Sequence, residues 1–222
     1  MKNRPLYFAM LGTLMLTAAA TTFGGWAVVT VDDMPEYAVA GKAIELPFTV
    51  RQHGVTLLGD LNPTLVATNG DTELTARARA AKDKGHYIVS FTPPSTAVWT
   101  LRIRSGFGNS ESKNIPLRVV ANGAAAPRKL ADAERGHQLF VAKGCVTCHM
   151  RGDDGADGLK LAPELSGRRY VPEYLARFLA DPVNNRLTQV ASNNRMPQLD
   201  LQQSEIASLI AFINSETKAK AD

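Results

Sequence analysis

Hydrophobic and polar positions alternate with a period of two along the first half of the chain. The strings AIELPFTV, HYIVSF and VWTLRIR place apolar side chains at every second position, which is typical of strands that bury one face. Similar strings, PTLVAT, ELTARARA and IPLRVV, and a first run from Trp26 to Val31 bring the expected number to about seven strands. Turn sequences such as Asn69-Gly70-Asp71 separate the strands.

The period becomes helical in the second half of the chain. One predicted helix runs to Gly144, a second begins at Pro172 and ends at Pro182, and a third lies near the C-terminus. Apolar residues follow the i, i+3, i+4, i+7 rule in the third helix, at Ile206, Leu209, Ile210 and Ile213. Between the two patterns, the string ANGAAAPRKLADA has no apolar period and contains turn formers, which indicates a short linker.

These patterns predict an α+β multidomain chain. Short antiparallel strands at this spacing are typical of an immunoglobulin-like β-sandwich, and the helical region forms an all-α domain. The predicted boundaries are 1–25 for an export segment, 26–121 for the sandwich, 122–131 for the linker, 132–217 for the helical domain and 218–222 for a tail.

Two strings of the predicted sandwich, RQHGVTLLGDLNPTLVA and FTPPSTAVWTLRI, resemble extracytoplasmic YtkA-like (FixH-type) domains. The resemblance implies a sandwich fold outside the cytoplasm. It carries no chemical motif.

The export segment allows two interpretations. Lys2 and Arg4 precede an uncharged apolar run with small residues at its end, which predicts a secretory signal cleaved after Ala20. The alternative is a retained membrane anchor over residues 6–31, because about 20 apolar residues span a bilayer. Both interpretations place the remaining chain in the periplasm or another extracytoplasmic compartment.

Charge and cysteine content narrow the functional classes. The formal net charge is +4, and Lys2 and Arg4 supply half of it, so neither half is basic enough to suggest a nucleic-acid partner. Of the 222 residues, 45% are hydrophobic and 21% are charged, as in folded proteins with a core. The only two cysteines, Cys145 and Cys148, exclude a disulfide framework and a four-cysteine zinc site.

The string from Cys145 to His149, CVTCH, is C-x-x-C-H, the attachment sequence of a c-type haem. Each thiol adds to one vinyl group of the porphyrin, and the histidine after the second cysteine is placed to bind the iron. An isolated C-x-x-C can also be a redox disulfide or half of a zinc site. Because His149 follows immediately and no second cysteine pair exists, we predict one covalent haem c, held by Cys145, Cys148 and His149.

The sequence on both sides of this motif resembles class I cytochrome c, over roughly Asp132 to Thr217. The resemblance implies an all-α cytochrome c domain whose first and last helices cross near a right angle. It also implies that Gly136 lets the first helix approach an aromatic residue of the last helix closely, a role that Phe212 fits.

The string LAPELSG is similar to the G-P-x-L segment of the same family, although Ala162 stands where glycine is usual. The similarity implies that the Pro163 carbonyl accepts a hydrogen bond from His149 and so fixes its orientation. Just after this loop, Arg168 or Arg169 is a candidate to neutralise a haem propionate. A solvated loop arginine is the alternative.

The sixth ligand of the iron has three candidates besides an open position. Met150 adjoins His149 and cannot pass around the porphyrin edge, and His137 suits a surface or packing role on the first helix. Met196-Pro197, in the loop before the last helix, is similar to the M-P ligand loop of the cytochrome c family. The resemblance implies that Met196 binds the iron, and a His/Met pair raises the reduction potential.

The predicted sandwich contains no cysteine, which excludes copper sites built on thiolates. His53, His86 and Met34 remain as conceivable copper ligands, but they show no spacing signature and fit satisfied or exposed side chains better. We therefore expect the sandwich to be a docking module or a spacer.

Together these features predict a mono-haem electron carrier and not an enzyme. Its expected partners are a redox protein donor and acceptor, in or beside a respiratory or photosynthetic chain, such as a membrane oxidoreductase complex. A haem sensor, assembly factor or enzyme subunit with an open iron site is the alternative, and carbon monoxide binding distinguishes the two.

Overall fold

The computed structural model describes residues 25–155, 161–185 and 196–216. The predicted signal or anchor before residue 25 and the predicted tail lie outside the described residues. Within the described part, no helix has both the length and the apolar character needed to cross a bilayer.

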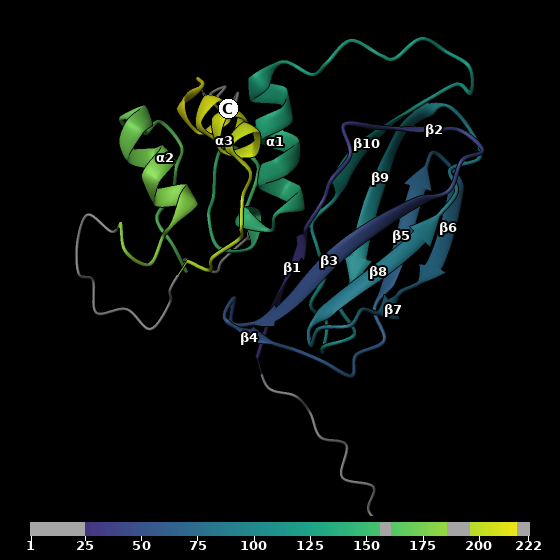
Figure 1. The fold of residues 1–222 in the computed structure, drawn as a ribbon, viewed down its shortest axis with the longest axis horizontal. Helices are drawn as coiled ribbons and strands as arrows, with labels where there is room; N and C mark the ends of the chain where they lie inside the picture. Colours follow the sequence, from purple (N-terminus) through teal and green to yellow (C-terminus); the bar gives the residue numbers. More distant parts are fainter. Residues whose placement is uncertain (1–24, 156–160, 186–195, 217–222) are drawn as a thin grey trace, which may run out of the picture.

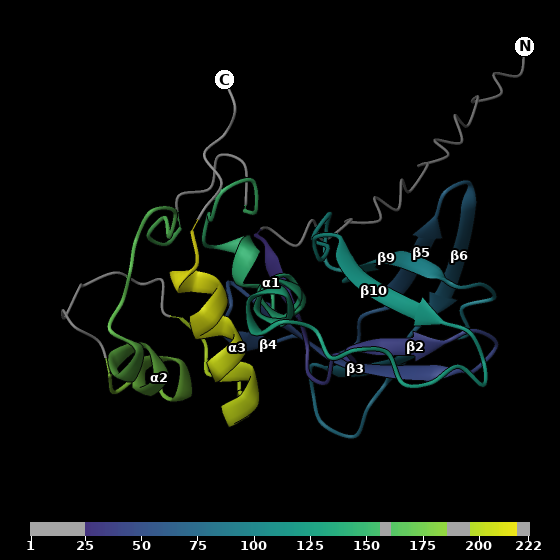
Figure 2. The same ribbon diagram turned by 90° about the horizontal axis from the view of Figure 1, so that it is seen from above.

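The N-terminal half is a sandwich of two β-sheets, and the helices lie to one side of it (Figures 1 and 2). One sheet has the order β1-β3-β8-β7, with β4 paired to β3, and the other has the order β2-β10-β9-β5-β6. Only the β2–β10 pair is parallel among the described strand pairs. The bounds are β1 (Ala27–Val31), β2 (Tyr37–Val39), β3 (Ile44–Gln52), β4 (Thr56–Leu57), β5 (Thr64–Asn69), β6 (Thr72–Arg77), β7 (Arg79–Ala80), β8 (His86–Phe91), β9 (Ala97–Arg104) and β10 (Ile115–Val120).

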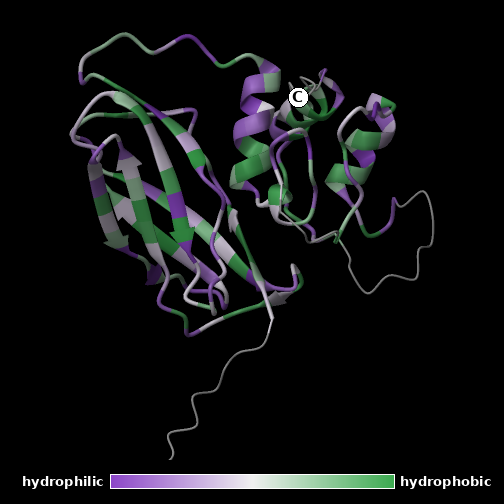
Figure 3. Cartoon of the chain, turned by 180° about the vertical axis from the view of Figure 1, so that it is seen from behind, coloured by the Kyte–Doolittle hydropathy of each residue, from purple (hydrophilic) through white to green (hydrophobic). Residues whose placement is uncertain are grey.

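The predicted alternation is confirmed in the long strands. In β9, Trp99, Leu101 and Ile103 are buried in the core, while the residues between them are more exposed. Figure 3 shows the resulting bands of hydrophobic and hydrophilic residues along the strands. The core between the sheets follows from this period-two pattern.

Two details of the sandwich differ from the prediction. The string ELTARARA, expected as one strand, forms β6 and β7, which belong to different sheets. The change occurs at Ala78, whose N–H donates to the Pro63 carbonyl at 3.0 Å, so the chain leaves one sheet for the other there. The short strands β2 and β4 were not predicted, because two or three residues cannot display a period.

Strand β1 is an edge strand that is nevertheless buried at all five positions. Ala27, Val29 and Val31 belong to the hydrophobic core, and Val28 lies on the side that the helical half covers. Because residues 27–31 are a strand of the sandwich, the prediction of a membrane anchor that reaches residue 31 is wrong in its last part.

The helical half contains α1 (Asp132–Ala142), the 3₁₀ turn η1 (Cys145–Thr147), α2 (Pro172–Ala180) and α3 (Gln203–Asn214). Helix α2 begins at Pro172 and ends before Pro182, as predicted. Helices α1 and α3 pack against each other at Gly136, where an added Cβ would lie 2.0 Å from the Ser208 carbonyl oxygen and 2.5 Å from Phe212 Cβ. The expected close approach of Gly136 to Phe212 is therefore confirmed.

Lys143, directly after α1, joins the two halves of the molecule. Its side chain is 1% exposed, and its Nζ lies 2.8 Å from Oε1 of Glu205 on α3. The same ammonium group donates a hydrogen bond of 2.7 Å to the carbonyl of Asp32 at the end of β1. One buried cation thus connects α1, α3 and the sandwich.

Further contacts surround this connection. A Cβ on Gly144 would lie 2.7 Å from both Val28 Cγ1 and the Val29 carbonyl oxygen, so only glycine allows β1 to approach this closely. On α1, Arg135 donates to the Met34 carbonyl at 2.6 Å, and Gln138 donates to the Pro116 carbonyl at 2.9 Å. The halves therefore share a packed interface in addition to the predicted linker, a contact that neither the docking-module nor the spacer interpretation anticipated.

We expect Lys143→Met to lower the free energy of unfolding by about 3–5 kcal/mol, because it leaves the buried Glu205 carboxylate without its cation. Guanidinium denaturation of the full chain measures this effect. The double variant Lys143→Met/Glu205→Leu should recover much of the loss, since it removes both charges. Lys42→Met, at an exposed position, is the control; equal stability of the two single variants would contradict the assignment.

Candidate functional site

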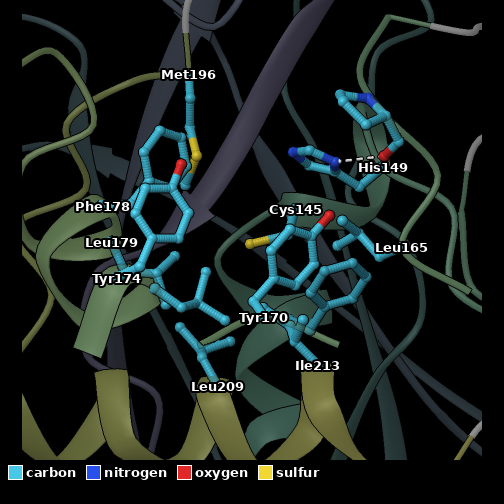
Figure 4. Close-up of a pocket in the computed structure, with 13 residues that line it drawn as sticks. Cys145, His149, Leu165, Tyr170, Tyr174, Phe178, Leu179, Met196, Leu209 and Ile213 are labelled. Atoms are coloured by element: carbon cyan, nitrogen blue, oxygen red, sulfur yellow. Dashed lines mark hydrogen bonds between the residues drawn. The ribbon is translucent and has the colours of Figure 1, made fainter. Parts of the chain in front are cut away.

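An apolar pocket opens between the helices and holds most of the predicted site residues. The empty space that it encloses at the surface, part of it open to solvent, is about 750 Å³. Figure 4 shows its walls, which come from α1, α2, α3, η1 and the loops between them. The lining residues are Phe140, Cys145, His149, Pro163, Leu165, Tyr170, Tyr174, Leu175, Phe178, Leu179, Met196, Leu209 and Ile213.

The His149 imidazole stands on one wall and is oriented by Pro163. Nδ1 of His149 lies 2.8 Å from the Pro163 carbonyl oxygen. A carbonyl can only accept, so Nδ1 carries the proton and Nε2 keeps a free lone pair. Figure 4 shows Nε2 directed into the pocket, toward the side where Met196 lies. Burial lowers the pKa of His149 and the hydrogen bond to Pro163 opposes this fall, so the neutral form is favoured.

The loop that carries Pro163 is held against the C-x-x-C-H segment. The Leu165 N–H donates to the Met150 carbonyl at 2.8 Å, and the Gly152 N–H donates to the Ser166 hydroxyl at 2.8 Å. These bonds tie the loop to residues on the C-terminal side of His149. The Pro163 carbonyl is therefore fixed relative to the ring that it orients.

Cys145 begins the η1 turn, Cys148 directly follows it, and both cysteines are free thiols. The His149 N–H donates to the Cys145 carbonyl at 2.9 Å, which closes the turn, and Gly144 precedes it with a φ of 77°. Cys145 lines the pocket, whereas Cys148 is not among the lining residues. Burial raises the pKa of Cys145 to about 12, with the neighbouring Cys148 adding to the rise.

Met196 lies on the wall opposite His149, next to the aromatic side chains of α2 (Figure 4). The Tyr174 and Phe178 rings stack with their centroids 6.0 Å apart. The Met196 segment is joined to α2, because the Gln198 amide donates to the carbonyl of Ala180 at 2.8 Å. The structure thus brings an imidazole and a thioether to the same pocket from segments 47 positions apart in sequence.

Two long-range interactions around the pocket were not predicted. Tyr170 and Asn214 exchange two hydrogen bonds: the Tyr170 N–H donates to Oδ1 of Asn214 at 2.8 Å, and Nδ2 of Asn214 donates to the Tyr170 carbonyl at 2.9 Å. Arg151 donates to the Ser215 carbonyl and hydroxyl at 2.8 Å, and its guanidinium lies 4.0 Å from the Phe212 ring centroid. Both pairs fix the C-terminal end of α3, and neither has a local sequence signal.

Several candidates lie away from the pocket walls. Arg168 is exposed, and Arg169 pairs with Glu216 at 3.7 Å on the surface. Nε2 of His137 lies 3.0 Å from Asp154, and its ring lies 5.2 Å from that of Phe212, in agreement with the predicted surface or packing role.

The three conceivable copper ligands of the sandwich are separated and have other partners. The His53 ring contacts Trp26 with a centroid distance of 5.5 Å, Nδ1 of His86 lies 3.1 Å from the Thr49 hydroxyl, and Met34 is in the core. Within the described residues, no group of three His, Cys, Asp or Glu side chains is arranged to hold a metal ion.

Comparison with known proteins assigns the helical half. Residues 133–217 match the family model described as cytochrome c, so this half is a cytochrome c domain. Such a domain implies covalently bound haem c and supports a haem-binding electron-transfer protein with redox protein partners, a class that is typically extracytoplasmic. No curated protein matches the chain.

Similarities to solved structures are weak. Domains 1–6 of the surface layer protein SbsC give a TM-score of 0.34 at 20% identity over 44% of this chain, which spans 13% of that chain. The Lin-41 filamin domain gives a TM-score of 0.33 at 12% identity, covering 42% of this chain and 91% of that chain. These scores carry no argument about the sandwich, and the YtkA-like resemblance stays a prediction.

We expect the haem-free protein to lose stability as the pH rises above about 9. The unfolded Cys145 thiol ionises near its ordinary pKa of 9.0, whereas the folded thiol stays protonated to about 12. The unfolded state then binds fewer protons, so the free energy of unfolding falls with pH, by at most about 1.4 kcal/mol per pH unit for one group. Urea denaturation between pH 8 and 11 should give a flatter dependence for Cys145→Ala; parallel curves would contradict the buried thiol.

Proposed function

We propose that this protein is a mono-haem c-type cytochrome that passes single electrons between extracytoplasmic redox proteins. The observation that carries the proposal is that His149 and Met196 lie on facing walls of one apolar pocket. Cys145 lines the same pocket. An imidazole nitrogen, a thioether and the C-x-x-C-H thiols are the donor set that would hold a c-type haem and its iron. The residues present therefore fit the group.

In this proposal Cys145 and Cys148 would hold the haem covalently, and His149 and Met196 would be the protein ligands of its iron. Haem supplies reversible one-electron exchange at the iron. The chain supplies orientation: the Pro163 carbonyl keeps the proton on Nδ1 of His149 and leaves Nε2 available as a ligand.

The apolar walls have a separate role. Leucine and aromatic side chains from α2 and α3 exclude water from the space between His149 and Met196. A low-dielectric environment disfavours the extra positive charge of the oxidised state, and a thioether ligand favours iron(II), so both features raise the reduction potential. Arg168, exposed just beyond the Pro163 loop, is our candidate to neutralise a propionate.

The wider assignment follows from the same architecture. We propose residues 26–121 as the sandwich, 122–131 as the linker and 132–217 as the haem domain, exported by the segment 1–25. A place in or beside a respiratory or photosynthetic chain, against a membrane oxidoreductase complex, fits a fused electron carrier of this kind.

We expect Met196→Ala to remove the weak methionine-to-iron absorbance at the red end of the oxidised spectrum. It should also let the ferrous protein bind carbon monoxide readily at neutral pH, which the unaltered protein should refuse. Met150→Ala is the matched control, because Met150 adjoins His149 but does not line the pocket.

Two results would contradict the proposal. Retention of the red absorbance band in Met196→Ala would show that Met196 is not a ligand of the iron. Ready carbon monoxide binding by the unaltered protein would instead favour a sensor, assembly factor or enzyme subunit with an open site. Intact-mass measurement must show the haem increment in both variants before either result is interpreted.

A further inference from the structure

The sandwich contacts both segments that carry the proposed iron ligands. Val28 and Val29 of β1 lie against Gly144, next to the haem-attachment turn. On the other segment, Gly54 lies close to Pro197, the residue after Met196: a Cβ added to Gly54 would lie 3.9 Å from Pro197 Cδ. One end of the sandwich therefore lies beside both ligand segments.

Gly54 belongs to the turn between β3 and β4, and a hydrogen bond to Trp26 holds this turn in place. His53 and Gly54 both have left-handed backbones, with φ of 50° and 73°. The His53 N–H donates to the Trp26 carbonyl at 3.0 Å, and the two rings are in contact. Gly54 itself is buried. A turn held in this way presents a fixed surface to the loop that carries Met196 and Pro197.

A charge interaction adds to this contact. Arg51 is the penultimate residue of β3, and its guanidinium lies 3.5 Å from the Thr30 hydroxyl. Burial lowers the pKa of Arg51, and the carboxylates of Asp32 and Asp200 oppose this fall. Asp200 belongs to the Met196 loop and has a φ of 50°, a conformation that its surroundings must hold.

We propose that the β-sandwich is a working part of the iron site: through Gly54 and Arg51 it positions the Met196 loop and so sets how readily the thioether leaves the iron. This inference rests on the proposed role of Met196 as a ligand. The loop has a second attachment, from the Gln198 amide to the carbonyl of Ala180 at the end of α2. Gly54 and Arg51 are positioning residues, because they act only through the loop.

The physical consequence is a competition. An external ligand reaches the iron only in the fraction of molecules whose methionine has dissociated, so its apparent affinity reports that fraction. A loop that loses its support against the sandwich opens more often. The affinity for added imidazole therefore measures positioning directly, and a purely structural weakening of the distant sheets would not change it.

The first test is Gly54→Asn, with imidazole titrated into the oxidised full-length holoprotein. Asparagine tolerates the left-handed backbone, and its Cβ would lie 3.9 Å from both Pro197 Cδ and Val28 Cγ2, so we expect its carboxamide to crowd this junction. We expect the apparent imidazole affinity to rise about fivefold or more, as the methionine-bound fraction falls. Gly41→Asn is the matched control, because Gly41 has a φ of 75° and no atom within 4 Å of an added Cβ.

A second variant keeps the test valid if Gly54→Asn fails to fold. Arg51→Gln should raise the imidazole affinity by at most about fivefold, because it removes a positive charge that attracts the Asp200 carboxylate across partly exposed surface. Arg51→Lys should restore most of the original value. Arg79→Gln is the control, since Arg79 pairs with Glu45 at 3.2 Å on the exposed surface of the sandwich.

The outcomes separate the two proposals. Unchanged affinity in Gly54→Asn and Arg51→Gln, with raised affinity in Met196→Ala, would overturn the positioning role and leave the ligand assignment intact. Unchanged affinity in Met196→Ala as well would overturn both. Raised affinity in the two junction variants but not in their controls is the result expected.

Discussion

The arrangement of the molecule depends on one buried ammonium group. Lys143 sits where helix α1, helix α3 and strand β1 meet, and it satisfies the Glu205 carboxylate and the Asp32 carbonyl together. A buried charge is tolerated only when partners surround it, so these three elements have little freedom to separate. Because Lys143 is followed directly by Gly144 and Cys145, the same interaction that joins the halves also places the haem-attachment turn.

Hydrogen bonds around the pocket are a second constraint: they fix the protonated nitrogen of His149 and the positions of the surrounding loops. The Pro163 carbonyl decides which nitrogen of His149 keeps its proton, while Tyr170 and Arg151 fasten the surrounding loops to the end of α3. These groups determine the direction and the protonation of the side chains that we propose as iron ligands.

The sequence predicted those features that depend on local pattern or on a short motif. Alternation located the long strands, proline located the ends of α2, and CVTCH with Met196-Pro197 located the residues that the structure brings to one pocket. Features that depend on residues far apart in the sequence could not be predicted from it. The burial of both faces of β1 depends on Gly144, and the pairing of Tyr170 with Asn214 spans 44 positions, so no local period records either. The division of ELTARARA escaped because β7 has only two residues and so cannot display a period of its own.

Strand β1 also has a consequence for how the chain assembles. It is the edge of its sheet, and the residues that cover it, led by Lys143, lie 111 positions later in the sequence. A sandwich that forms before the helices arrive therefore has a bare edge, which is a template for pairing with a neighbouring molecule. In the proposed haem protein, attachment requires accessible thiols at Cys145 and Cys148, and docking of Gly144 on β1 constrains the turn that leads to them. The order of haem attachment and docking would then decide how long the edge of the β-sheet stays exposed.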